Sequence, residues 1–171
     1  MRVAARALIV LFVIAVGAGA RPGLAQTANG PSLAVQADGL LLFRGTDRSA
    51  AFSPFLAFEL RVVSSLSLRL GLSPPLGNDT GQQAFATNLA INVWFGKGPD
   101  FIETAIGTYY RNTWCNGSPD YKAYTLYLGL RHASRSSVFR LGGILGVTPG
   151  GQLAIGVGIG FGRAIGSHFL R

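Results

Sequence analysis

The sequence predicts an all-β fold, a single eight-stranded antiparallel barrel that crosses a membrane, and three observations support this. Apolar and polar residues alternate with a period of two, as they do in β-strands. The alternating segments are about ten residues long or slightly longer, which suits tilted strands that cross a bilayer. Large apolar side chains gather on one face of each segment, and small or polar side chains gather on the other.

The first 25 residues predict a cleaved signal peptide. A short basic start, MRVAAR, precedes the apolar run ALIVLFVIAVGAGA, and the small residues of GLA stand before Gln26. The apolar run is short for a membrane-spanning helix, and Arg21 and Pro22 follow it directly. We assign residues 1–25 to the signal peptide, with an alternative cut after Ala20, and residues 26–171 to one barrel domain.

Composition argues against several other classes of protein. Hydrophobic residues make up 49% of the chain and charged residues only 13%. The arginines are scattered singly through apolar stretches, so we expect no nucleic-acid partner. Cys115 is the single cysteine, which excludes an internal disulfide, and its distance from the cleavage site argues against a lipid anchor.

The alternation places eight strands along the mature chain. In residues 62–72, VVSSLSLRLGL, every second residue from Leu66 to Leu72 is leucine, and Ser67, Arg69 and Gly71 stand between them. Strict alternation over this length favours a strand. The same rule predicts strands near 33–44, 51–63, 65–73, 84–96, 101–113, 121–134, 137–148 and 152–165.

The links between these strands differ in length. Those at 64–65, 96–100 and 134–137 are tight, whereas those at 73–83 and 114–120 are longer and carry the Pro, Gly, Asn and Asp of turns. The links GTDRS and TPGGQ are also short, so the asymmetry is partial. It predicts that both termini lie on the tight-turn side, and that loops 73–83 and 114–120 form a contact surface on the other side.

The two strand faces distinguish a membrane barrel from a soluble sandwich. The large apolar set is too continuous to face water, and the polar set is too small to be a whole protein surface. We therefore expect apolar side chains towards lipid and polar or small side chains in the lumen. The sheet must then close, because every backbone N–H and C=O must be paired in hydrocarbon. The ionisable residues predicted in the lumen are Asp38, Glu59, Arg61, Arg69, Glu103, Arg111, Arg131 and Arg140.

The last predicted strand, QLAIGVGIGFGRAIG, has glycine at every second position from Gly156 to Gly162. This spacing fits neither G-x-G-x-x-G nor G-x-x-x-x-G-K-[ST], so we reject a phosphate-binding loop. We expect the glycines to point inwards and to leave room for arginine side chains in a narrow lumen. Aromatic residues near strand ends suit interfacial girdles: Phe43, Phe52, Trp94, Phe95, Phe101, Tyr110, Tyr121 and Phe169.

Three stretches carry a resemblance to a known family: NVWFGKGPDFIETAIGTYY, YTLYLGLRHASRSSVFRLGGILGVTPGG and the closing glycine strand. They resemble the small porin-like outer-membrane β-barrel proteins of Gram-negative bacteria, of the outer membrane protein A and X type. The resemblance implies the outer membrane as location, outer-membrane lipid and lipopolysaccharide as partners, and a structural or surface-interaction role. Such barrels often end on an aromatic residue, whereas here Leu170 and Arg171 follow Phe169.

A hydrolase is one alternative that the sequence leaves open. The stretch RHAS holds His132 and Ser134, and outer-membrane lipid A deacylases carry a similar His-x-Ser-Asn motif in which a carboxylate orients the histidine. Here Arg135 stands in the place of the asparagine, and no Asp or Glu follows Asp120. The predicted topology also puts His132 at the tight-turn rim, away from outer-leaflet lipid A. We therefore expect no catalytic activity.

A narrow solute pore is the other alternative. Arginines outnumber carboxylates in the predicted lumen, so a hydrated lumen would prefer anions, but the lumen of an eight-stranded barrel is usually filled by side chains. His168 has no second His or Cys neighbour, so we expect no metal site, and we expect no cofactor. We expect a monomer.

Overall fold

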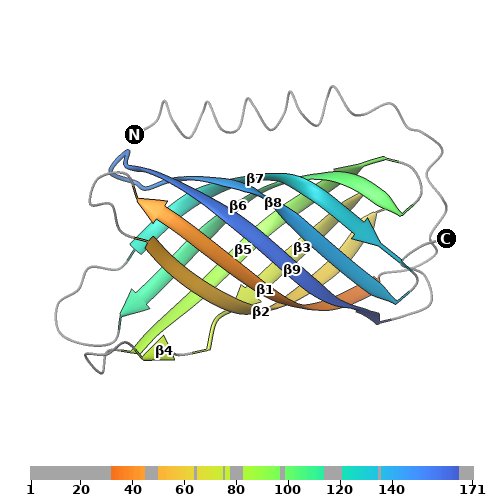
Figure 1. The fold of residues 1–171 in the computed structure, drawn as a ribbon, viewed down its shortest axis with the longest axis horizontal. Helices are drawn as coiled ribbons and strands as arrows, with labels where there is room; N and C mark the ends of the chain where they lie inside the picture. Colours follow the sequence, from red (N-terminus) through yellow and green to blue (C-terminus); the bar gives the residue numbers. More distant parts are fainter. Residues whose placement is uncertain are drawn as a thin grey trace.

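The computed structural model describes residues 32–44, 50–63, 65–74, 76–77, 83–96, 99–113, 121–134 and 136–165, which form one antiparallel sheet (Figure 1). The predicted signal peptide lies outside these residues. The strands are β1 (Ser32–Arg44), β2 (Ala50–Val63), β3 (Leu66–Leu72), β4 (Leu76–Gly77), β5 (Gln83–Phe95), β6 (Asp100–Thr113), β7 (Tyr121–Ala133), β8 (Ser137–Val147) and β9 (Leu153–Ile165).

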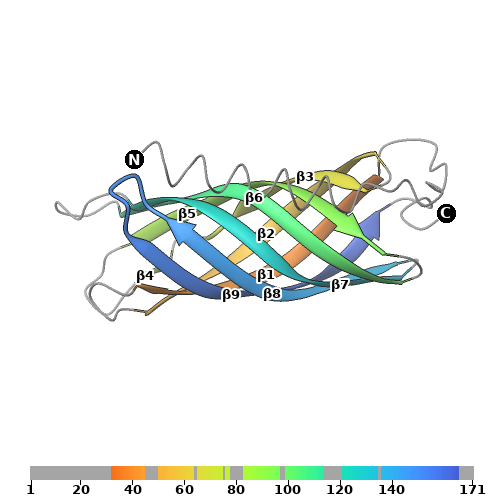
Figure 2. The ribbon, with the colours of Figure 1, turned by 90° about the horizontal axis from the view of Figure 1, so that it is seen from above.

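The sheet closes on itself. Neighbouring strands pair in sequence order, β3 pairs with β5, and the first strand, β1, pairs with the last, β9 (Figure 2). Eight main strands therefore make the closed antiparallel barrel that the alternation predicts, and each predicted strand end agrees with the structure to within one residue. No helix in the described part of the chain is long and apolar enough to span a membrane.

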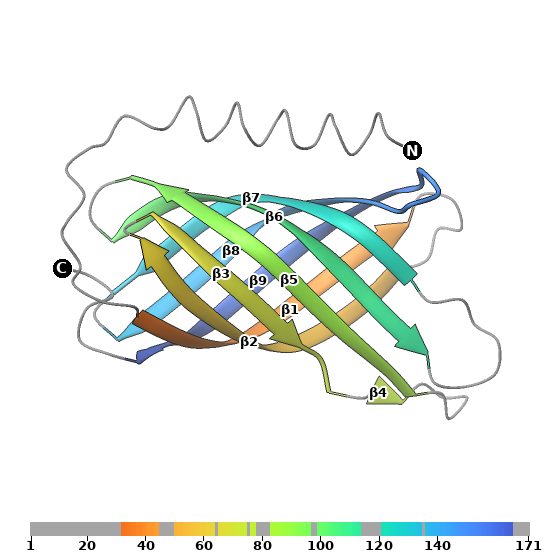
Figure 3. The same cartoon turned by 180° about the vertical axis from the view of Figure 1, so that it is seen from behind.

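One segment differs from its prediction, because the two-residue strand β4 lies within the expected loop 73–83. Beyond β3, the Ser73 N–H still donates to the Ala86 carbonyl at 2.8 Å, and β4 then pairs with the start of β5 (Figure 3). Pro74 interrupts the strand between them, since proline has no backbone N–H to donate to a ladder.

The register fixes the tilt of the strands. The row of paired residues that starts at Lys122 in β7 passes through Tyr110, Thr87, Leu72, Leu56, Ala37, Phe161 and Phe139. It returns to β7 at His132, ten residues further along the same strand. With eight strands this stagger corresponds to a tilt of about 40°, so each residue advances about 2.5 Å along the barrel axis.

The glycines of β9 face the lumen, and the apolar residues between them face outwards. Every inward position of β9, from Ala154 to Ala164, is glycine or alanine. A Cβ atom on Gly160 would meet the Asp38 carboxylate and would lie 2.9 Å from Cγ of Arg140. Glycine is therefore required at this position because two interior charged side chains occupy the space that a side chain would need.

Two adjacent glycines of β8 make a matched test of this packing. A Cβ on Gly142, which faces the lumen, would lie 2.6 Å from Cα of Gly129 and 2.7 Å from Cζ of Tyr127, whereas a Cβ on Gly143 would meet nothing within 4 Å. We expect Gly142→Ala to lower the free energy of unfolding by about 1–3 kcal/mol through overpacking. Gly143→Ala should leave it unchanged or raise it slightly. Urea unfolding in vesicles measures both, and equal effects would contradict the packing described.

Candidate functional site

The outer face of the barrel is an apolar belt bounded by ionisable residues. Its exposed side chains are large and apolar, for example Leu128 and Ile155, which are 62% and 66% exposed. Among the outward side chains that the structure describes, the ionisable ones lie only near the two rims: Lys122 on the side of the longer loops, and Asp100, His132 and Arg163 on the tight-turn side. Ten residues separate Lys122 from His132, a height of about 25 Å, which matches the hydrocarbon thickness.

The inner face carries a network of buried ion pairs. Glu59 of β2 is fully buried and accepts hydrogen bonds from Arg131 of β7 at 2.8 and 3.0 Å, from Ser67 and from Gln36. Glu103 of β6 is also fully buried and accepts from Arg140 at 3.0 Å. The network therefore connects strands on opposite sides of the lumen.

A third ion pair and two aromatic rings complete this layer. Arg69 pairs with Asp38, so each of the three interior carboxylates that the structure describes meets an arginine. The guanidinium of Arg131 lies 4.5 Å from the Trp94 ring centroid, and that of Arg140 lies 4.6 Å from the Tyr127 ring centroid. Such stacking is favourable because the ring faces attract cations in a poorly hydrated site.

Three aromatic residues predicted for the interfacial girdles lie inside instead. Trp94 is only 7% exposed beneath Arg131, Phe101 packs against an interior cluster, and Tyr121 packs against Tyr109. Phe43 and Phe52 are exposed on the outer face, as expected for girdle residues. Proximity to a strand end does not reveal which face a side chain occupies, so the girdle prediction was wrong for the three inward positions.

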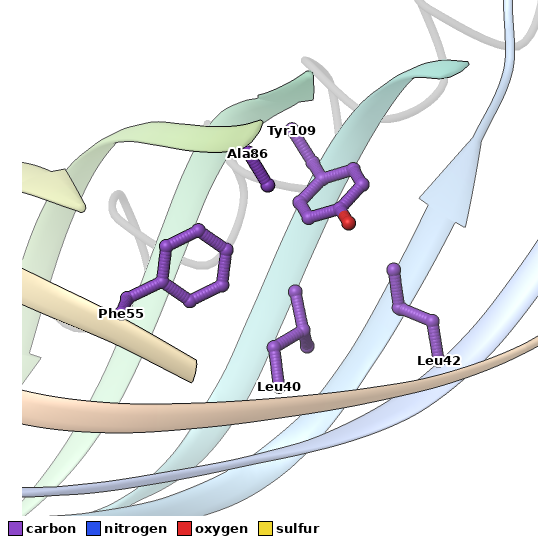
Figure 4. Close-up of a cluster of buried hydrophobic side chains, with 5 residues drawn as sticks. All are labelled: Leu40, Leu42, Phe55, Ala86 and Tyr109. Atoms are coloured by element: carbon purple, nitrogen blue, oxygen red, sulfur yellow. The ribbon is translucent and has the colours of Figure 1, made fainter. Parts of the chain in front are cut away.

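An apolar cluster fills the lumen towards the longer loops. Leu40 and Leu42 of β1 and Phe55 of the neighbouring β2 face Ala86 and Tyr109 across the barrel (Figure 4). The rings of Phe55 and Tyr109 meet edge to face with centroids 6.2 Å apart, and the Tyr109 hydroxyl lies 3.0 Å from that of Ser53. Side chains thus fill the lumen at two levels, with the apolar cluster at one and the ion pairs at the other.

A cavity of about 60 Å³ lies between these two layers. Leu40 and Phe55 line it from the apolar cluster, and Asp38, Arg69, Asn92, Tyr127 and Arg140 line it from the polar layer. Four buried polar atoms of these residues have no hydrogen-bond partner within the described chain: Asp38 Oδ1, Arg69 Nε, Asn92 Oδ1 and the Tyr127 hydroxyl. The cavity can hold a few water molecules, which would supply such partners.

The remaining predicted site residues lie apart from this centre. Arg61 is buried nearer the tight turns and donates to the Val63 carbonyl at 3.3 Å, and Arg111 is partly exposed near the longer loops. No group of three or more His, Cys, Asp or Glu that could hold a metal occurs among the described residues, and His168 lies outside them.

His132 and Ser134 do not meet in the structure. Nδ1 of His132 lies 2.7 Å from Oδ1 of Asp100, on the outer face at the tight-turn rim. The Ser134 hydroxyl lies 2.6 Å from the Ser137 hydroxyl and so lies within the β7–β8 turn. Sequence reasoning missed Asp100 as the partner of His132, although the tight links 96–100 and 134–137 place both residues at the same rim.

Comparison with known proteins finds similarity at the level of structure. No protein-family model matches the chain, and no curated protein matches it in sequence. The N-terminal β-barrel domain of OprF from Pseudomonas aeruginosa superposes with a TM-score of 0.56 at 15% identity, and the alignment covers 77% of this chain and 96% of that one. The chain has the fold of small outer-membrane β-barrels.

Neisserial surface protein A agrees with this outer-membrane barrel fold. Its TM-score is 0.51 at 10% identity, with 78% of this chain and 96% of that chain covered. At such low identities the likeness concerns the fold, and it transfers no site residue. What this barrel does therefore depends on its own interior, belt and rims.

Proposed function

We propose that this chain is a monomeric integral outer-membrane protein of a Gram-negative bacterium with a structural or surface-interaction role. The observation that carries the proposal is the filled lumen, in which an apolar cluster and an ion-pair network lie in series. A barrel closed at two levels is suited to hold loops at a surface rather than to transport solutes. The interior then serves stability, and function belongs to the outer face and the loops.

Lipid and lipopolysaccharide are the partners that the outer face fits. The belt is predominantly apolar over the height of a hydrocarbon layer, with aromatic residues such as Phe43 near the loop-side rim. Lys122 lies at that rim with its Nζ 5.2 Å from the Tyr110 ring centroid, where its charge can reach lipid phosphates. Loops 73–83 and 114–120, most of which lie outside the described residues, are the proposed surface for any further ligand.

The closed lumen gives a direct test of this role. We expect the full chain in planar bilayers to show no steady ionic conductance, because the two layers block the lumen independently. Removing one layer, for example with Phe55→Ala, should leave conductance absent because the ion pairs remain. A steady wild-type conductance that falls in Arg140→Gln would contradict the structural role and support an anion-preferring pore.

The hydrolase alternative has one favourable contact and one unfavourable contact. Asp100 can orient His132, as the carboxylate of a catalytic triad does. The serine hydroxyl that the histidine would have to activate is bonded to Ser137 within the turn. The geometry therefore favours a rim ion pair over a catalytic site.

A further inference from the structure

The barrel wall is incomplete between β2 and β3. β2 has 14 residues and β3 has 7, and their ladder ends at the pair Leu56–Leu72. Beyond Leu72 the chain follows β5, through Ser73 and then β4, and leaves β2. Residues Ala50–Phe55, which we call the β2 edge, therefore pair with β1 on one side but with no described residue on the other.

The β2 edge lies at the depth of the membrane. The row of paired residues from Lys122 in β7 to Leu56 in β2 takes four strand-to-strand steps, which is half of the way around the barrel. Leu56 therefore lies below the level of Lys122 by half of the ten-residue stagger, which is five residues along a strand. The β2 residue level with Lys122 is thus five positions before Leu56, at Ala51. The β2 edge therefore occupies about the first 10 Å of the belt below the loop-side rim.

Backbone groups on the open side of the β2 edge, which no described residue pairs, require partners at this depth, because hydrocarbon offers none. Pro54 removes one N–H donor from the edge, which is a common adaptation of edge strands. The carbonyl groups and the other N–H groups remain. A lipid can approach them from the membrane, since its ester carbonyls and hydroxyls lie close to this level.

The side chains around the edge suit an uncharged chain. On the outside, Phe52 is 60% and Leu56 is 49% exposed. On the inside, Ser53 and Phe55 are buried, and Phe55 contacts the backbone of β3, since a Cβ on Gly71 would lie 3.3 Å from its Cδ1. No ionisable side chain lies among the described residues of the edge, so an acyl chain fits it better than a phosphate group does.

We propose that the β2 edge is a lateral binding site for one acyl chain of a membrane lipid in the loop-side leaflet. The chain packs along Phe52 and Leu56, and the ester carbonyl of the lipid accepts a hydrogen bond from a β2 backbone N–H that no described residue pairs. The site is continuous with the lipid-facing belt, so a lipid can enter it from the bilayer. Because the bound lipid is also hydrogen-bonded, it exchanges with the bilayer more slowly than the neighbouring lipids do. It requires the barrel and its belt but no particular loop ligand.

The test uses the full chain in vesicles that contain a phospholipid with a diazirine in its acyl chain. After illumination, mass spectrometry compares labelling of the β2 edge and Leu56 with labelling of Tyr124–Leu128 in β7, a stretch at similar depth that is paired on both sides. We expect several-fold stronger labelling at the β2 edge. Equal labelling of the two stretches would overturn the proposal, because the edge would then be ordinary belt.

Two further arms make the result specific. Phe52→Ala should reduce labelling at the β2 edge, whereas Phe161→Ala, which removes an equally exposed ring from β9, should not. A diazirine fatty acid in unlabelled vesicles forms the second arm, and strong edge labelling by the free acid without labelling by the phospholipid would overturn the assignment to a membrane lipid. Gel migration with and without boiling checks that each variant is folded.

Discussion

Arg131→Met is expected to lower the free energy of unfolding by about 3–5 kcal/mol, the largest loss that any single interior substitution should produce. Arg131 is 2% exposed and binds Glu59 through two hydrogen bonds, and it lies 3.6 Å from Glu103. Methionine keeps most of the volume but leaves Glu59 buried without its cation. Urea unfolding in vesicles, followed by gel migration and by tryptophan emission, measures the loss.

Two control variants identify the origin of this loss. Arg163→Met removes an exposed arginine from the tight-turn rim and should change the free energy of unfolding by no more than about 0.5 kcal/mol. The double variant Glu59→Gln with Arg131→Met removes both charges and should recover part of the lost stability, because paired residues are not additive. Full stability in Arg131→Met alone would show that the ion-pair network does not hold the barrel together.

Leu128→Arg is expected to cost about 2–4 kcal/mol in a bilayer, because it places a charge near the middle of the apolar belt. Leu128 is 62% exposed and lies six residues from Lys122 along β7, close to halfway towards His132. The arginine head group cannot reach either rim without distortion of the side chain or of the surrounding lipid. Unfolding in vesicles measures the cost.

The same substitution closer to the rim separates membrane depth from other effects. Tyr124 is 48% exposed on the same face of β7, only two residues from Lys122. Tyr124→Arg should cost no more than about 1 kcal/mol, since the new charge lies near the lipid head groups. Equal costs at the two positions would mean that the belt does not lie in hydrocarbon as described.

Much of the fold follows from local patterns. Alternation in residues 62–72 and the tight links at 64–65, 96–100 and 134–137 determine the strand order and which face each side chain occupies. Pairing through these short turns explains the registers of the β2–β3, β5–β6 and β7–β8 hairpins. The short strand β4 was missed, because Pro74 breaks the alternation and only the contact with β5 makes those residues a strand.

The interior partners could not be predicted in the same way. The β7–β8 hairpin places Arg131 directly opposite Arg140, a like-charge pair that considered alone would be unfavourable. The pair of arginines is stable because two carboxylates approach from other strands: Glu59 of β2, which is 72 residues from Arg131 in the sequence, and Glu103 of β6. Periodicity shows that a side chain faces the lumen, but only the curvature of the closed barrel decides which side chains meet across it.

The inward row of β9 also bears on the order in which the barrel is completed. The paired carboxylates and arginines are contributed by β1, β2, β3, β6, β7 and β8, and β9 adds only glycine and alanine to the lumen. β9, the last described strand, can therefore pair with β1 and β8 after the interior has condensed, without displacing any large side chain. Closure then requires only backbone hydrogen bonds, and the final step of assembly is separated from the packing that precedes it.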